Sequence, residues 1–168
     1  ILCAQYYPKS HTIRIGIADT GLGIKTTINR SYDASNDLEA IQYALTPGIT
    51  GTTRKEGGTE QNAGAGLFFI KSIANVNRDF FTIYSGTGMY KLLTRPSTSK
   101  RIKLFVDPFL DKHSKGDDFP YWQGTVVGID ISLDRTEEFS HLLSLIRDTY
   151  GKAVRERRQA RYKKPKFI

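Results

Sequence analysis

Cysteine is almost absent from this sequence. Cys3 is the only one in 168 residues, so the chain can form neither an internal disulfide nor a cysteine-based zinc site. The three histidines, His11, His113 and His141, lack the spacing of metal ligands. Long apolar runs are also missing, because no stretch approaches the roughly 20 apolar residues of a membrane span. No secretory signal sequence opens the chain either. We therefore expect a cytoplasmic protein without membrane contact.

Acidic residues are scarce at the C-terminal end. The net charge is +8, and residues 151–168 hold eight of the 25 basic residues but only one of the 17 acidic ones, Glu156. The rest of the chain is therefore nearly neutral. We expect residues 134–168 to form a C-terminal helix, from Glu137 onward, and a basic tail. The tail is either a solvated, frayed end or an arm for RNA, DNA or an acidic protein partner.

The apolar residues, 39% of the chain, suffice for one domain with a sizeable core. Strand-like runs occur at residues 1–7, 12–18, 79–84, 89–94, 102–106 and 124–133. Helical patterns occur at residues 37–46, capped by Asn36 and Asp37, and from residue 64 onward. Turns or loops are expected at residues 8–11, 49–63 and 111–120. This order predicts an α+β fold, a two-layer sandwich of a mixed, mainly antiparallel sheet with helices on one face. Because Ile1 already lies in a strand-like run, we expect the chain to be a fragment or to have lost an N-terminal segment.

Two glycine-rich segments carry the chemistry of the sequence. In the first, Asp19 ends an apolar strand and is followed by Gly21 and Gly23. A carboxylate there can accept a hydrogen bond from an exocyclic amino group, and the glycines let a flat base approach the backbone. In the second, Gly64 and Gly66 open a helix, where free amides and the helix dipole favour phosphate. Each segment alone is a weak signal, and the spacings of the P-loop and of the dinucleotide fingerprint are absent.

Together these segments resemble the GHKL superfamily of ATPases, which includes sensor histidine kinases, DNA gyrase and heat-shock chaperones. Residues 17–24 are similar to its first glycine box, residues 64–67 to its second, and Gly124-Thr125 to its closing Gly-Thr. The resemblance covers roughly residues 1–133. It implies a Bergerat-type sandwich that binds ATP between the sheet face and a flexible lid, which corresponds to residues 48–63.

The resemblance also implies a role for each site residue. Asp19 accepts the hydrogen bond of the adenine amino group, and Thr125 supports this contact through water. The base is walled by Gly21, Gly23 and Ile24, and the phosphates meet Gly64, Gly66 and Leu67. In the lid, Arg54 and Lys55 either reach a terminal phosphate or are solvated loop cations.

One part of the family pattern is missing. The helix whose Glu or Asp and Asn hold Mg²⁺ and activate water is not in this sequence, so we expect the Mg²⁺ ligands in the complete protein and not in this chain. The complete protein is then an ATPase or a protein-kinase-like phosphotransferase, whereas this chain hydrolyses ATP poorly. Two alternatives are a regulatory protein that binds a partner or nucleic acid and uses ATP as a conformational latch, and a degenerate scaffold that binds no nucleotide.

Overall fold

The computed structural model describes residues 1–55, 57–58, 63–93, 104–133 and 139–161. Its strands are β1 (Leu2–Tyr7), β2 (Thr12–Ala18), β3 (Phe81–Gly86), β4 (Gly88–Leu92), β5 (His113–Gly116) and β6 (Trp122–Ser132). They form one six-stranded sheet in the spatial order β1-β2-β6-β3-β4-β5. Every pairing between these described strands is antiparallel.

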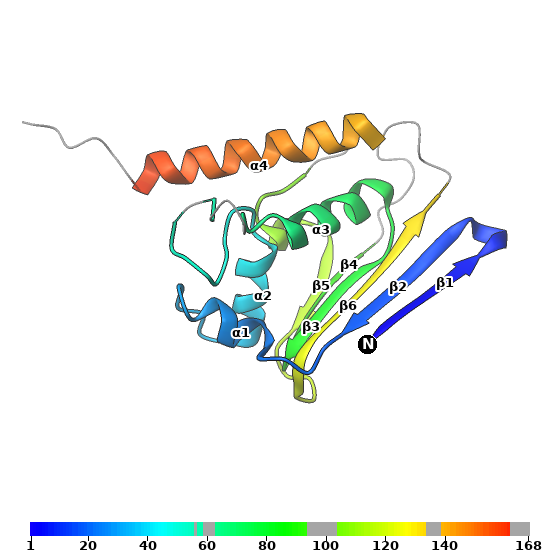
Figure 1. Ribbon diagram of the computed structural model, residues 1–168, viewed down its shortest axis with the longest axis horizontal. Helices are drawn as coiled ribbons and strands as arrows, with labels where there is room; N and C mark the ends of the chain where they lie inside the picture. Colours follow the sequence, from blue (N-terminus) through cyan, green and yellow to red (C-terminus); the bar gives the residue numbers. More distant parts are fainter. Residues whose placement is uncertain (56, 59–62, 94–103, 134–138, 162–168) are drawn as a thin grey trace, which may run out of the picture.

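The helices lie on one face of this sheet (Figure 1). They are α1 (Gly23–Ile28), α2 (Asp37–Leu45), α3 (Gly66–Asn77) and α4 (Phe139–Arg161), with short 3₁₀ turns η1 (Pro8–Ser10) and η2 (Pro108–Leu110). The first three α-helices contact the sheet, whereas α4 packs along the outer side of α3. The predicted α+β sandwich with helices on one face is confirmed, but the sheet was expected to be mixed and its described strands are all antiparallel.

The core lies between the centre of the sheet and the helices. The register between β2 and β6 pairs Ile15 with Ile129 and Ile17 with Val127, so these apolar side chains share one sheet face. On that face Val127 and Ile129 pack against the buried residues of the main core. A second cluster joins the two outer helices through three buried side chains, Phe68 of α3 with Leu142 and Ile146 of α4. This second cluster fixes α4 on the body of the domain.

Most predicted elements occur where the sequence placed them. The strands β1, β2, β3, β4 and β6 and the helices α2 and α3 match the expected runs within a few residues. The cap of α2 is also as expected, since Asn36 Oδ1 accepts a hydrogen bond of 2.8 Å from the Glu39 amide. These elements carry strong local signals, an alternating apolar pattern or a capped apolar stripe.

Other expectations are corrected by the structure. The segment 111–120, expected to be a loop, contains β5, and α1 begins inside the first glycine-rich segment, where only a turn was expected. Residues 104–106 of the expected strand 102–106 are not a strand, and its first two residues lie outside the described part. The C-terminal helix is not a fully solvated end, because it buries Leu142, Ile146, Ala153 and Val154. Residues 162–168 of the expected basic tail lie outside the described part. Among the described residues, none of the helices combines the length and the apolar character that a bilayer crossing requires.

Candidate functional site

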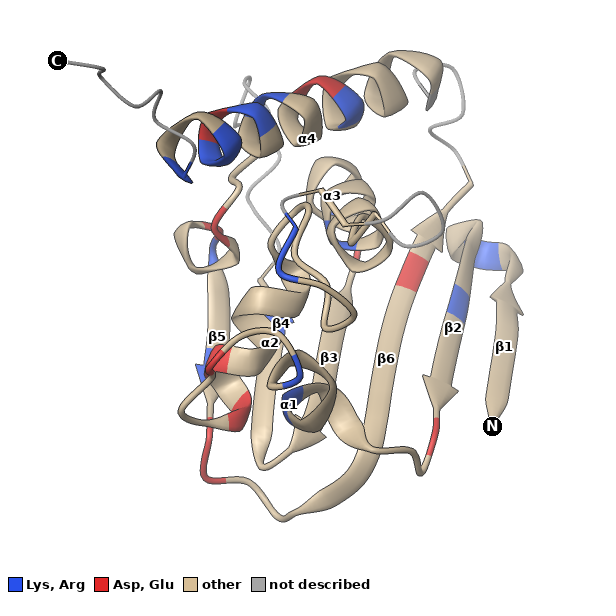
Figure 2. Cartoon of the chain, turned by 60° about the vertical axis from the view of Figure 1, so that its left-hand side comes forward, with Lys and Arg blue, Asp and Glu red and all other residues tan. Residues whose placement is uncertain are grey.

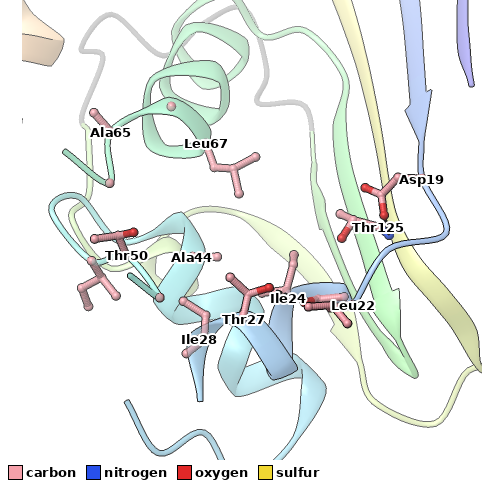
Figure 3. Close-up of a pocket in the computed structure, with 15 residues that line it drawn as sticks. Asp19, Leu22, Ile24, Thr27, Ile28, Ala44, Thr50, Ala65, Leu67 and Thr125 are labelled. Carbon is pink, nitrogen blue, oxygen red and sulfur yellow. Dashed lines mark hydrogen bonds between the residues drawn. The ribbon is translucent and has the colours of Figure 1, made fainter. Parts of the chain in front are cut away.

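A cleft of about 420 Å³ opens on the helix-covered side of the sheet. Its lining comes from the end of β2, from β6, α1, α2, the loop after α2 and the start of α3: Asp19, Leu22, Gly23, Ile24, Thr27, Ile28, Ala44, Ile49, Thr50, Gly51, Gly64, Ala65, Gly66, Leu67 and Thr125. Figure 3 shows Asp19 and Thr125 on one side, Ala65 and Leu67 on another, and Ile24, Thr27 and Ala44 between them. All the predicted site residues except Gly21 therefore line a single cleft.

The Asp19 carboxylate is held in place by the backbone at one end of this cleft. Its Oδ1 accepts hydrogen bonds from the amides of Gly21, at 2.8 Å, and Thr125, at 3.2 Å. The Asp19 amide in turn donates to the Thr125 carbonyl at 2.9 Å. For Oδ2, the described residues provide no hydrogen bond. One carboxylate oxygen is thus fixed, and the other is open to solvent or a ligand.

Gly21 has a different place from the one expected. It does not line the cleft as a wall of the base, and its amide orients the Asp19 carboxylate instead. The Asp-x-Gly spacing explains this, because an aspartate side chain readily accepts a hydrogen bond from the amide two residues later.

Close backbone approach at Gly124 brings the two strand ends together. Its φ is +103°, and a Cβ there would lie 2.2 Å from the Asp19 carbonyl oxygen, so no other residue type fits without a shift. The Gly124 carbonyl accepts a hydrogen bond of 2.7 Å from Ser85 Oγ, which itself accepts one of 2.9 Å from the Ile24 amide. Ser85 of β3 therefore ties the start of α1 to β6. The sequence alone did not single out this serine.

The opposite end of the cleft is the turn that opens α3. Gly64 has a φ of +63°, and a Cβ there would lie 2.3 Å from the Ile49 carbonyl oxygen. Its own carbonyl accepts a hydrogen bond of 2.9 Å from the Gly48 amide. The residue that caps α3 is Ala65, whose side chain cannot accept hydrogen bonds from the first turn. The backbone amides in the first helical turn of α3 therefore depend on solvent or on a ligand for hydrogen-bond partners.

The expected lid is only partly described, because residues 56 and 59–62 lie outside the described part. Ile49, Thr50 and Gly51 line the cleft. Gly51 packs directly on α1, since a Cβ there would lie 2.0 Å from the Thr27 carbonyl oxygen. Arg54 Nε donates to the Ser31 carbonyl, and Arg54 is not among the residues that line the cleft. In this arrangement the guanidinium acts on the backbone after α1.

Of the apolar floor of the cleft, only Ile24 was predicted. The floor also includes Ile28, which is buried like Ile24 and lies one turn after it on α1, together with Ala44 of α2. The spacing of four residues between the two isoleucines was the available signal, although six residues are too few for a clear helical period. The result is an apolar surface between two polar ends, suited to a flat ring system.

The residues of the cleft do not fit a magnesium site. Asp19 is the only carboxylate among the lining residues, and the described part of the chain contains no group of three or more metal-ligating side chains. Magnesium in nucleotide sites is usually held by one or two carboxylates together with the phosphates, and Asp19 lies at the end of the cleft away from the Gly64 turn.

Comparison with known proteins adds no family to this geometry. None of the models of known protein families matches the chain, and a search of curated proteins finds no match either.

Proposed function

We propose that this chain is the ATP-binding domain of a histidine-kinase-like ATPase of the GHKL type. The observation that carries the proposal is the joint lining of one cleft by Asp19, Thr125 and the turn from Gly64 to Leu67. These residues come from the ends of two strands and from a helix start that are far apart in the sequence. Their convergence supplies an amino-group acceptor and a set of phosphate-facing amides across an apolar floor.

The Asp19 end suits adenine. With Oδ1 occupied by two amides, Oδ2 remains to accept a hydrogen bond from a ligand. The 6-amino group of adenine is a donor to this oxygen, whereas guanine in the same pose would place its 6-carbonyl, an acceptor, there. The site therefore favours ATP and ADP over GTP and GDP.

The Gly64 end suits phosphate. α3 has 12 residues, so its dipole and its first-turn amides attract an anion at Gly66 and Leu67. The positive φ of Gly64 turns the chain so that this helix start lines the cleft. Since the described residues that line the cleft do not form a magnesium site, the proposal is limited to nucleotide binding.

The test is a thermal shift with ADP for the wild type and the Asp19→Asn variant. A ligand that binds only the folded state stabilises it by about 2.7 kcal/mol at a hundredfold excess over Kd. In the variant, the amide oxygen can replace Oδ1, and the NH₂ group then faces the adenine amino group, so we expect roughly 10- to 100-fold weaker ADP binding.

Asp130→Asn is the matched control. Asp130 lies on β6, where Arg14 Nε donates to it at 3.1 Å, and it does not line the cleft. The Asp130→Asn substitution removes the same charge as Asp19→Asn and should leave ADP binding unchanged. Asp19→Asn should also reduce the preference for ADP over GDP. Equal ADP shifts in the wild type and Asp19→Asn would contradict the base contact, and no shift in the wild type would indicate the degenerate scaffold.

A second candidate function is binding of a nucleic acid along α4, whose described part carries several basic residues (Figure 2). The observation that favours it is a second hollow of about 460 Å³, whose lining holds three arginines of α4 against one carboxylate: Arg147, Arg155, Arg158 and Asp148, with Tyr150, Gly151, Val154 and Gly57. Binding of single-stranded RNA should weaken steeply with salt and should fall in an Arg147→Gln/Arg155→Gln variant. Equal affinities in the wild type and this variant would exclude the helix as the binding surface.

A further inference from the structure

The C-terminal helix reaches the chain directly before the phosphate-binding turn. Tyr150 Oη of α4 donates a hydrogen bond of 2.7 Å to the carbonyl of Ala63, although the two residues are 87 positions apart. Ala63 is followed by Gly64, the residue with positive φ that turns the chain into α3. The hydroxyl of Tyr150 therefore acts on the backbone immediately upstream of the cleft.

The same tyrosine also packs on the chain after the turn. Its ring lies 6.3 Å from the ring of Phe69, centroid to centroid, and belongs to the apolar cluster around Phe68 and Ile146. The Phe69 amide donates a hydrogen bond of 2.9 Å to the Ala65 carbonyl. Tyr150 thus contacts both sides of the glycine turn.

One turn further along α4, Val154 supports the backbone segment that pairs with this turn. A Cβ on Gly48 would lie 2.6 Å from Val154, and one on Gly57 would lie 3.0 Å from it, so the valine fills the space between these two glycines. The Gly48 amide donates to the Gly64 carbonyl at 2.9 Å. One face of α4 therefore holds the Gly64 turn and its backbone partner.

We propose that Tyr150 is a positioning residue for the phosphate end of the cleft. This inference rests on the proposed nucleotide binding and adds a residue from outside the three family-like boxes. By fixing Ala63 and Phe69, Tyr150 aims the first-turn amides of α3 at the phosphates. It does not touch the adenine end, where Asp19 is held by β6.

Calorimetric titration with ADP and with adenosine tests this assignment. Tyr150→Phe keeps the ring and removes only the hydroxyl, so ADP should bind roughly 2- to 10-fold more weakly, the range that one net hydrogen bond supports, while adenosine affinity stays unchanged. Tyr90→Phe is the control, because Tyr90 Oη also donates to a backbone carbonyl, that of Pro108, at 2.9 Å. Tyr90 does not line the cleft, so its variant should bind both ligands as the wild type does.

Amide hydrogen exchange without ligand gives a second readout. In Tyr150→Phe the amides of Gly64, Ala65 and Gly66 should exchange faster, and in Tyr90→Phe they should not. Equal weakening of ADP and adenosine, or unchanged exchange together with unchanged ADP affinity, would overturn the inference. If the wild type binds neither ligand, the proposed function fails. Faster exchange at the Gly64 turn in Tyr150→Phe would then show that the contact of Tyr150 still positions this turn.

Discussion

A buried ion pair between α3 and the segment before β5 offers the sharpest test of the fold. Lys71 Nζ lies 2.5 Å from Asp111 Oδ2, and both side chains are fully buried. The lysine also donates to the Phe105 carbonyl at 3.2 Å, and Asn75 Nδ2 donates to Asp111 Oδ1 at 2.7 Å. Both carboxylate oxygens are thus bonded in a water-excluded place.

Lys71→Met keeps most of the side-chain volume but leaves the Asp111 charge without its cation. Removing one partner of a buried pair costs about 3–5 kcal/mol, a large part of the roughly 5–15 kcal/mol that stabilises a typical domain. Replacing both charges with apolar residues, Lys71→Met/Asp111→Leu, should be less destabilising than Lys71→Met alone, because no unpaired charge remains.

The assay is urea unfolding followed by circular dichroism. Lys152→Met is the control, since Lys152 and Glu156 form an exposed pair 3.9 Å apart on α4. Losing that pair should cost less than about 1 kcal/mol. If Lys71→Met cost no more than Lys152→Met, the buried pair would not act as an anchor of α3, and the reasoning would be refuted.

Two further predictions concern the site and pH. Gly124→Ala forces a Cβ to 2.2 Å from the Asp19 carbonyl oxygen at a φ of +103°, so its midpoint of thermal unfolding should fall by several degrees, in line with about 1–3 kcal/mol of strain. Gly16→Ala, where nothing lies within 4 Å of the added Cβ, is its control, and equal midpoints would contradict the close approach. Burial raises the pKa of Tyr150, so the wild type should lose stability as the pH rises from about 10 through the raised value, and Tyr150→Phe should lose less. Unfolding free energies at pH 9 and 11 check this, and the same pH dependence in both proteins would contradict it.

The sequence predicted those helices and strands that local patterns, such as alternation or a helix cap, largely stabilise. The alternation of Ile13, Ile15 and Ile17 predicts β2, and the cap at Asn36 predicts α2. The strand β5 escapes such prediction because its four residues are polar or glycine, and it exists through its antiparallel pairing with β4. In α1, threonine and isoleucine are poor local helix formers. That helix is stabilised by the burial of Ile24 and Ile28 in the main core.

Most residues of the site could be predicted from the two glycine-rich segments, but the contacts that hold these residues in place could not. Asp19 and Gly64 could be singled out from the sequence, since each lies in a short segment with a chemical reason for its residue type, whereas Thr125 was named only through the family resemblance. The approach of Gly124 to Asp19 depends on strand pairing across the sheet, and the bond from Tyr150 to Ala63 spans 87 positions. Contacts of this kind leave no periodic signal in a single sequence.

The two ends of the cleft are held by different parts of the fold. Asp19 is fixed by Thr125 and Gly124, within strands β2 and β6 that pair from Thr12 to Ala18. The Gly64 turn is fixed by Gly48 and by α4, which packs on α3 and donates a hydrogen bond to Ala63 through Tyr150. A change that loosens α4 should therefore weaken the contribution of the phosphates to binding while the adenine contact persists. Under the proposed nucleotide binding, we expect base recognition and phosphate recognition to be separable, and the second to depend on the C-terminal helix.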